Sequence, residues 1–261
     1  MNLSEDSFSD GGRYADPVAA LAHAERLLAE GADVLDLGAA ASHPDAKPVS
    51  PEVEIARLEP VVVTLLARGA EVSIDTFSPP VQDWALALGV AWLNDIDGFP
   101  DPERYPHLAR GRAKLVVVHS VQGRGRATRV ATDPASLVPR IEAFFAERVG
   151  ALVAAGVARE RIVLDPGMGF FLGSNPEASL AVLRALPRLR ARAGLPLLVS
   201  VSRKSFLGSL IGRQIADRGA ATLAAELYAA AHGADFVRTH DVRELRDALA
   251  VTRALEREGD A

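Results

Sequence analysis

Short apolar runs alternate along this chain with longer segments whose apolar residues recur at helical spacing. The runs are rich in Val, Ile and Leu, which is typical of strands buried on both faces of a parallel sheet. They predict strands at 33–38, 72–76, 90–96, 114–120, 161–165, 197–201 and 235–240. The segments between them predict helices at 18–30, 51–67, after 79–80, near 103, at 134–155, from about 176, from 206 and at 242–256.

This alternation runs through the whole chain without a low-complexity linker, so residues 1–261 are expected to form a single domain. Strand–helix units build parallel sheets, and the simplest α/β fold for them is a (β/α)8 TIM barrel. The loop and helix at the start lack a preceding strand, so the first barrel strand is expected to be missing or truncated. A doubly wound open sheet is the alternative. Against it, no Gly-x-Gly-x-x-Gly follows the first predicted strand, and polar residues end every strand rather than one switch point.

Composition narrows the classes of function. The net charge is −5 and the basic residues are scattered, which argues against a nucleic-acid partner. The chain has no cysteine, so disulfides and thiol chemistry are excluded. No run reaches the roughly 18 apolar residues of a membrane span, and no signal peptide is recognisable. We therefore expect a cytoplasmic protein that binds neither membranes nor nucleic acid.

Polar side chains stand at the end of every predicted strand. In a barrel these ends converge on one face, where active sites are built. The residues there are Asp36, Asp75, Asn94, Asp95, His119, Asp165, Lys204, Ser205, Arg238 and His240. One such carboxylate, as at Asp36, is more often structural, and His119 is as readily a packed histidine as a ligand. A whole ring of polar groups is harder to explain by packing, because unpaired buried charge is unfavourable.

The strand-end residues divide by chemistry into two groups. Asp75, Asn94 and Asp165 supply acceptors and an amide, which suit the donor-rich edge of a flat heterocycle, and Lys204 adds a donor. Arg238, His240 and the helix that starts near Ser205 form a separate cationic group, which suits a phosphate or pyrophosphate. A solvated loop with a Ser cap is the alternative for residues 202–205. The pattern predicts a site for a polar heterocycle with a phosphate leaving group nearby.

Six motifs in this chain resemble those of dihydropteroate synthase. They are Glu5-Asp-Ser-Phe-Ser-Asp-Gly-Gly12, Asp75-Thr76, Asn94-Asp95-Ile96, Asp165-Pro-Gly-Met-Gly-Phe170, Ser202-Arg-Lys-Ser205 and Arg238-Thr-His240. Within that family the chain is most similar to the sulfonamide-resistant branch, through residues 40–46, 94–101, 165–172 and 197–208. The resemblance extends along nearly the whole chain.

The resemblance implies a transferase that joins 6-hydroxymethyl-7,8-dihydropterin pyrophosphate to p-aminobenzoate, releasing pyrophosphate and forming 7,8-dihydropteroate. It implies a dissociative reaction with Mg²⁺ as cofactor, and we expect a homodimer. By resemblance, the pterin is held by Asp75, Asn94, Asp165 and Lys204, and the catalytic set is Lys204, Asp75, Arg238 and His240. Pyrophosphate contacts fall on Asn2, Ser42, His43, Arg238 and His240, with Asn2 near the metal. The p-aminobenzoate contacts fall on Phe8, Ser42, Pro44, Phe170, Phe171 and Ser205.

Three departures from the family pattern refine this expectation. Ala41-Ser-His-Pro44 stands where the family has Ser-Thr-Arg-Pro, so His43 replaces an arginine. The loop after residues 161–165 is about two residues longer, around Phe171 and Leu172, and we expect its bulk to exclude sulfonamides. The family's first strand would precede Asn2.

Two other functions are possible for a chain with these motifs: a pterin-binding methyltransferase domain and a non-catalytic pterin-binding paralogue. The cationic group argues against the methyltransferase.

Overall fold

A computed structural model describes residues 1–3 and 16–257 of the chain. The strands are β1 (Leu35–Leu37), β2 (Val72–Asp75), β3 (Trp92–Asp95), β4 (Lys114–Val118), β5 (Ile162–Asp165), β6 (Leu198–Val199) and β7 (Phe236–Val237). All seven lie within the predicted runs, and each is shorter than its prediction. The motif at residues 5–12, with Phe8, lies outside the described residues.

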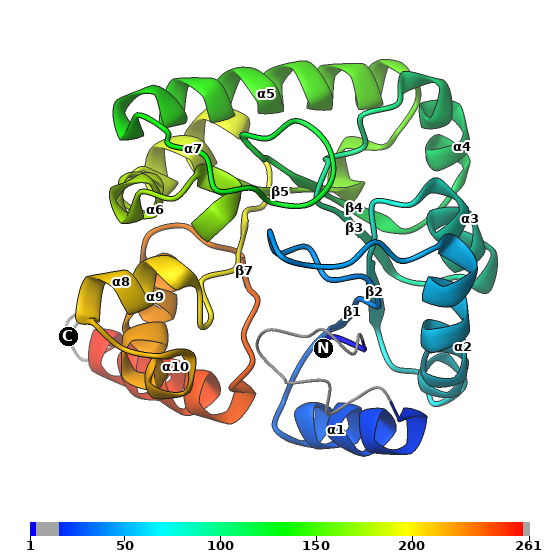
Figure 1. Cartoon of the computed structure of the whole chain (residues 1–261), viewed down its shortest axis with the longest axis horizontal. Helices are drawn as coiled ribbons and strands as arrows, with labels where there is room; N and C mark the ends of the chain where they lie inside the picture. Colours follow the sequence, from blue (N-terminus) through cyan, green and yellow to red (C-terminus); the bar gives the residue numbers. More distant parts are fainter. Residues whose placement is uncertain (4–15, 258–261) are drawn as a thin grey trace.

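The helices surround these strands (Figure 1). They are α1 (Pro17–Ala29), α2 (Pro51–Ala67), α3 (Pro79–Leu88), α4 (Tyr105–Arg110), α5 (Pro134–Ala154), α6 (Pro176–Arg184), α7 (Leu186–Ala193), α8 (Ser205–Ile211), α9 (Gly219–Ala231) and α10 (Val242–Arg257). Several begin with Pro in the first turn after a side-chain cap, as with Asp16 before α1 and Asn175 before α6. The sequence did not predict a break between α8 and α9, which follows from the left-handed backbone at Gly212.

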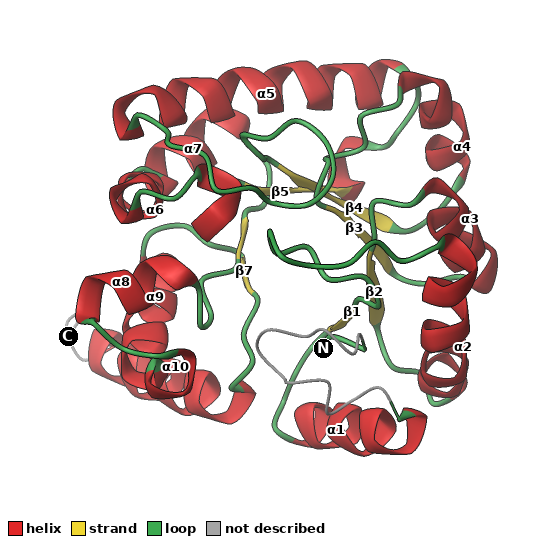
Figure 2. Cartoon of the chain, in the orientation of Figure 1, coloured by secondary structure: helices red, strands yellow, loops and turns green. Residues whose placement is uncertain are grey.

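Every strand pairing is parallel, as predicted. β1 to β5 form one sheet in chain order, and β6 pairs with β7 in a second. An isolated parallel bridge between Leu164 and Leu197 joins the two sheets. The strands lie inside a ring of helices (Figure 2), which is the predicted barrel arrangement and excludes the open-sheet alternative.

Alternate strand residues face two separate apolar layers. The larger core lies between strands and helices and contains fully buried residues such as Leu93, Leu115 and Ile162. The smaller cluster contains the intervening residues Trp92, Val116, Val118 and Val163, which face the barrel interior. None of the described helices is long and apolar enough to span a membrane.

A short stretch of parallel pairing lies beside β1. Asn2 forms a single parallel bridge with Gly38, just beyond the end of β1, and the Leu3 amide donates to the Gly38 carbonyl at 2.7 Å. Among the described residues this is the only trace of a strand between β7 and β1.

Candidate active site

The strand ends deliver their polar side chains to the middle of the barrel. Asn94 at the end of β3, Asp165 at the end of β5, Lys204 and Arg238 line one small cavity, together with Gly167 and Phe171. Asp75 adjoins this group through Arg238. The four side chains expected to hold a heterocycle therefore lie together, as their positions at strand ends predicted.

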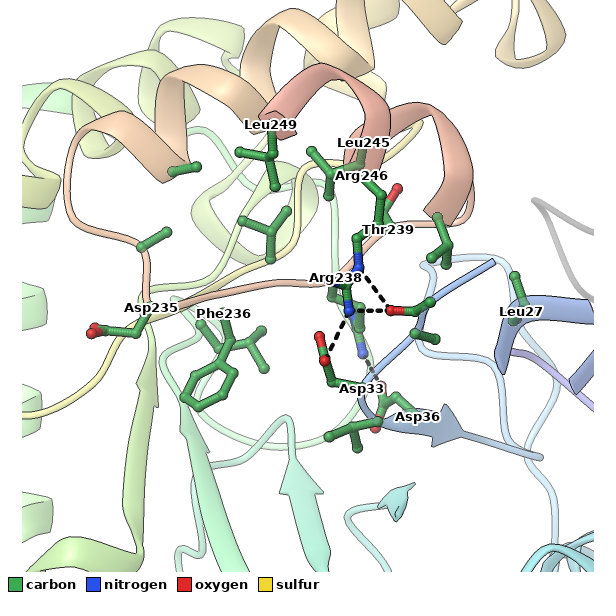
Figure 3. Close-up of a pocket in the computed structure, with 18 of the residues that line it drawn as sticks. Leu27, Asp33, Asp36, Asp235, Phe236, Arg238, Thr239, Leu245, Arg246 and Leu249 are labelled. Carbon is green, nitrogen blue, oxygen red and sulfur yellow. Dashed lines mark hydrogen bonds and ion pairs between the residues drawn. The ribbon is translucent and has the colours of Figure 1, made fainter. Parts of the chain in front are cut away.

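Arg238 lies between two carboxylates. Its Nη1 is 2.6 Å from Asp36 Oδ2 and 2.9 Å from Asp75 Oδ2, and its Nε donates to Ser200 Oγ at 3.0 Å. Arg238 and Asp36 are labelled together in Figure 3. The expectation that Arg238 belongs to a separate cationic group is wrong in this respect, because its long side chain reaches back to the carboxylates of β1 and β2.

The two carboxylates differ electrostatically. Burial opposes ionisation of Asp36, but the Arg238 guanidinium and the Met1 amino group outweigh it and hold the pKa of Asp36 below its usual range. Burial and the nearby Asp36 charge raise the pKa of Asp75 despite Arg238. Although both carboxyls share the Arg238 guanidinium, Asp36 is firmly ionised, whereas Asp75 takes up a proton more readily.

Asp36 was missed as a site residue, although its position at a strand end was a signal for it. It receives a hydrogen bond from Asn94 Nδ2 at 3.3 Å as well as from Arg238. Its buried Oδ1 and the buried Oδ1 of Asn94 accept no hydrogen bond from the described residues. Buried acceptors of this kind normally find a partner, so both oxygens are available to a ligand.

Lys204 and Asp165 form the opposite wall of the cavity. Burial, followed by repulsion from Arg238, lowers the pKa of Lys204 to about 8, although Asp165 and Asp75 attract its proton. Burial raises the pKa of Asp165, whose Oδ1 accepts the Gly167 amide at 2.8 Å. The Lys204 ammonium lies 5.3 Å from the centre of the Phe171 ring.

His240 is held beside the residue 202–205 loop. The Ser202 hydroxyl lies 2.7 Å from His240 Nδ1 and accepts the His240 amide at 3.2 Å. Burial lowers the pKa of His240 to about 3, assisted by the Met1 amino group and by Arg203. His240 is therefore neutral at pH 7, and the expectation that it adds positive charge is wrong.

An ion pair and an arginine hold the 202–205 loop in place. Arg203, whose backbone has a positive φ of 57°, pairs with Asp241 at 2.8 Å. Arg218 Nη1 donates to the carbonyls of Arg203 and Lys204 at 2.9 and 3.3 Å. These contacts fix the direction in which Lys204 leaves the backbone, so residues 202–205 form a braced loop rather than a freely solvated one.

Three loops meet at the mouth of the barrel. The Ala127 amide donates to the Ser42 carbonyl at 2.9 Å, and Arg129 pairs with Asp45 in the loop that carries His43 and Pro44. Arg129 also lies 5.8 Å from the centre of the Phe170 ring. Ser205 opens α8 close to the backbone of Gly169. The described residues expected to receive p-aminobenzoate therefore lie on the loops around the cavity.

The loop after β5, which was expected to be about two residues longer than in the family, lies in two environments. Phe171 packs with Ile96 and Ala127 and lines the cavity beside Lys204, whereas Leu172 is fully buried in the main core. Leu172 therefore cannot supply bulk at the far end of a benzoate pocket, as the loop was expected to do. Of these two side chains, Phe171 is the one that lines the cavity.

His119 and Asp95 have structural roles. His119 is 1% exposed, its Nδ1 lies 3.3 Å from the Pro166 carbonyl, and burial lowers its pKa to about 4. Asp95 accepts hydrogen bonds from Gln82 at 2.9 Å and from the amides of Asp97 and Phe99 at 2.8 and 3.2 Å. Both residues brace strand ends without lining the cavity.

Comparison with known proteins agrees with this geometry. The family model for pterin binding enzymes matches residues 1–240. The type-2 dihydropteroate synthase of Escherichia coli is 59% identical over 98% of this chain and 94% of its own length. The type-3 enzyme of the same species is 52% identical over 98% of this chain and 97% of its own length.

Solved structures with the same fold include two dihydropteroate synthases. The Xanthomonas albilineans enzyme, solved with 4-aminobenzoic acid, has a TM-score of 0.87 and 37% identity over 98% of this chain and 90% of its own. The Yersinia pestis enzyme, solved as a sulfonamide drug complex, has a TM-score of 0.89 and 33% identity over 98% of this chain and 92% of its own. With its barrel, its ring of strand-end carboxylates and a family match over most of its length, the chain belongs to the pterin-binding enzymes and, among them, to the dihydropteroate synthases.

Proposed function

We propose that this chain joins 6-hydroxymethyl-7,8-dihydropterin pyrophosphate to p-aminobenzoate, forming 7,8-dihydropteroate and pyrophosphate. The observation that carries the proposal is the convergence of Asn94, Asp165 and Lys204 on one cavity, with Asp75 and Arg238 at its edge. Carboxylates and an amide suit the N–H groups and carbonyl of a pterin ring. The family and its relatives support the same activity.

The reaction divides into two bond changes. The bond between the pterin methylene carbon and the pyrophosphate oxygen breaks first, and its electron pair leaves with pyrophosphate. Carboxylates at Asp75, Asp36 and Asp165 stabilise the positive charge that develops on the pterin. The arylamine nitrogen then attacks the methylene carbon and loses a proton to solvent.

Positioning carries the rest of the catalysis, because the proposed reaction passes through no covalent bond to the protein. Lys204 donates to the pterin while it is protonated, and Arg238 and neutral His240 face the departing pyrophosphate. Ser42 and His43 approach the same group from the loop after β1. These roles rest on the resemblance, and single substitutions test them one at a time.

Mg²⁺ is the cofactor that this reaction implies. Within the described residues no three acidic or histidine side chains form a metal cluster, so the protein would supply few ligands. Asn2, whose backbone pairs with Gly38 beside β1, is the residue that the resemblance places near the metal, and its side-chain amide offers a hard oxygen of the kind Mg²⁺ prefers. Asn2 would help to hold the ion, which would neutralise charge on the pyrophosphate oxygens.

We propose that sulfonamides are excluded at the p-aminobenzoate end of the site. The substrate is received by Phe170, Ser205, Ser42 and Pro44, with Phe8 in the part of the chain that the structure does not describe. Phe171 stands beside Lys204 and adds an aromatic ring to this wall. Sulfonamides extend beyond the substrate's carboxylate, so added bulk costs the drug more than the substrate.

We propose that the enzyme works in the cytoplasm as a homodimer. Candidate interface residues are exposed apolar side chains on α8 and α10: Leu210, Val251 and Leu255 are 59%, 61% and 70% exposed. Light scattering on the native protein and on Leu255→Glu tests the dimer, because a charge in the interface would dissociate it.

One incubation separates this function from its alternatives. Mass spectrometry should detect 7,8-dihydropteroate when both substrates are present. A pterin-binding methyltransferase would instead consume a methyl donor, and a non-catalytic paralogue would bind the pterin and make no product. Similarity to the type-2 and type-3 dihydropteroate synthases over nearly the whole chain supports the synthase over the methyltransferase.

A further inference from the structure

The loop between β4 and α5, residues 119–133, contacts two other loops at the mouth of the barrel. We name it the β4–α5 loop. Its Ala127 amide donates to the Ser42 carbonyl, in the loop after β1, at 2.9 Å. Its Val121 amide donates to the Phe171 carbonyl, in the loop after β5, also at 2.9 Å. The β4–α5 loop therefore joins two of the loops to which p-aminobenzoate contacts are assigned.

Within the β4–α5 loop, the side chain of Gln122 contacts the backbone next to Phe171. Its Nε2 donates to the Phe170 carbonyl at 2.6 Å and to the Thr128 carbonyl at 3.3 Å. Its Oε1 accepts a hydrogen bond from the Ser120 hydroxyl. Carbonyl oxygens only accept hydrogen bonds, so these partners determine which end of the Gln122 amide faces Phe170. Gln122 thus holds its own loop and the loop after β5 together.

The segment 167–173, which carries Phe171, lies closely against the β4–α5 loop. A Cβ on Gly167 would lie 2.4 Å from the His119 carbonyl oxygen, and Gly167 has a positive φ of 76°, so this approach requires glycine. Phe171 is 7% exposed and packs with Ala127 of the β4–α5 loop. The position of the Phe171 ring therefore depends on this loop through both backbone and side-chain contacts.

Phe171 connects these contacts to the site. It lines the cavity, and its ring centre lies 5.3 Å from the Lys204 ammonium. A side chain excludes a bulkier ligand only if it is held in place, so the neighbours that hold it contribute to the discrimination. Gln122 itself does not line the cavity. Its influence on a ligand must therefore pass through the segment that carries Phe171.

We propose that Gln122 is a positioning residue, which holds Phe171 at the p-aminobenzoate end of the site and thereby strengthens the rejection of sulfonamides. The proposal rests on the exclusion of sulfonamides proposed above. Without the Gln122 amide, the segment keeps the hydrogen bond from Val121 but loses the neighbouring one to the Phe170 carbonyl. The Phe171 ring can then move away from the substituent of the drug. p-Aminobenzoate ends before that substituent, so its turnover changes less.

A double-mutant cycle tests this role through the ratio of the sulfonamide inhibition constant to the Michaelis constant for p-aminobenzoate. Gln122→Ala should lower the ratio roughly three- to tenfold, the factor that one uncharged hydrogen bond supplies, and should change kcat by less than about twofold. Adding Gln122→Ala to Phe171→Ala should lower the ratio no further, because the ring that Gln122 positions is gone. Gln122→Glu keeps the acceptor that faces Ser120 but lacks the N–H groups, so it should behave like Gln122→Ala.

Ser174→Ala is the matched control. The Ser174 hydroxyl also joins the two loops, since it donates to the Val130 carbonyl at 3.1 Å, and the Ser174 amide donates to the same carbonyl at 2.8 Å. The substitution removes one side-chain hydrogen bond between the loops but leaves Gln122 and its partners in place. The ratio should therefore equal that of the unaltered protein.

Hydrogen exchange without any substrate reports the placement of the segment directly. The amides of Val121 and Gly173 donate to the Phe171 and Phe170 carbonyls at 2.9 and 3.2 Å. Both amides should exchange faster in Gln122→Ala than in the unaltered protein, because the segment that accepts their hydrogen bonds is held less firmly. Neither amide should exchange faster in the control.

Three results would overturn the proposal. A ratio that falls in Phe171→Ala but not in Gln122→Ala would leave the exclusion by Phe171 intact and give Gln122 a structural role alone. Losses that multiply in the double variant would mean that Gln122 acts independently of Phe171. Unchanged exchange at Val121 and Gly173 would mean that other contacts hold the segment, and this result counts whether or not the protein has synthase activity. An unchanged ratio in Phe171→Ala would instead refute the exclusion of sulfonamides on which the proposal rests.

Discussion

Replacing Arg238 with alanine is the perturbation for which the structure gives the clearest magnitude. The substitution removes the cation shared by Asp36 and Asp75. Breaking a fully buried pair costs about 3–5 kcal/mol, because a charge remains without a partner. Here the side chains of Arg238, Asp36 and Asp75 are 30%, 17% and 25% exposed, so solvent screens part of the loss. We expect the free energy of unfolding to fall by roughly 2–4 kcal/mol.

The loss should depend on pH. With Arg238 present, the depressed pKa of Asp36 gives stability that exists above its unfolded-state pKa of about 3.9 and disappears only as the pH falls through the lower folded value. Without Arg238, burial of both carboxyls is opposed less, so we expect the pKa of Asp36 and of Asp75 to rise. The free energy of unfolding of the variant then falls progressively as the pH rises above roughly 4, and it recovers when the pH is lowered.

Urea denaturation of both proteins at pH 5 and pH 8 measures this effect. Arg246→Ala is a matched control, since Arg246 also pairs with an aspartate, Asp33, but with side chains 50% and 87% exposed. The control should lose about 1 kcal/mol or less at either pH. The reasoning is refuted if Arg238→Ala costs no more than the control, or if its cost is the same at pH 5 and pH 8.

Three further predictions concern ligands. Asp165→Asn should weaken pterin binding at least tenfold by calorimetry, because a charge-assisted hydrogen bond worth roughly 1.5–3 kcal/mol is lost; unaltered affinity would remove Asp165 from the pterin site. Pterin affinity should decline above about pH 8 as Lys204 loses its proton, and Lys204→Arg, if it still binds, should abolish that decline. Phe171→Ala should lower the ratio of the sulfonamide inhibition constant to the Michaelis constant for p-aminobenzoate by roughly several hundredfold, for a clash of about 3–4 kcal/mol. If Phe171→Ala is active and this ratio is unchanged, then residues other than Phe171 distinguish the sulfonamide from p-aminobenzoate.

The strands and the residues at their ends were predictable because both follow from local patterns. A buried parallel strand must be apolar throughout, and the polar residue that ends it must face the common end of the barrel. The pattern places Asp75, Asn94 and Asp165 at the site, and it also indicates Asp36. It undervalued Asp36 because a single carboxylate at a strand end is usually structural.

The predictions for Arg238, His240 and Leu172 were wrong because they depended on the reach of long side chains and on burial. Arg238 lies at the end of β7, but its guanidinium reaches Asp36 of β1, a contact across 202 residues that no local pattern encodes. The neutrality of His240 follows from its burial and the cations around it, neither of which is visible in Arg238-Thr-His240. Likewise, the sequence shows two apolar residues after Phe170, but only packing distinguishes Phe171, in the cavity, from Leu172, in the core.

The central claim is that one site holds both substrates and transfers the pterin from pyrophosphate to an arylamine. Its most direct test is the release of pyrophosphate by the purified protein with Mg²⁺, measured with each substrate alone and with both. We predict release only with both substrates, in a one-to-one ratio with 7,8-dihydropteroate, and loss of release in Asp165→Asn at substrate concentrations that saturate the unaltered protein. Pyrophosphate released equally without p-aminobenzoate, or no release while the pterin substrate is bound, would contradict it.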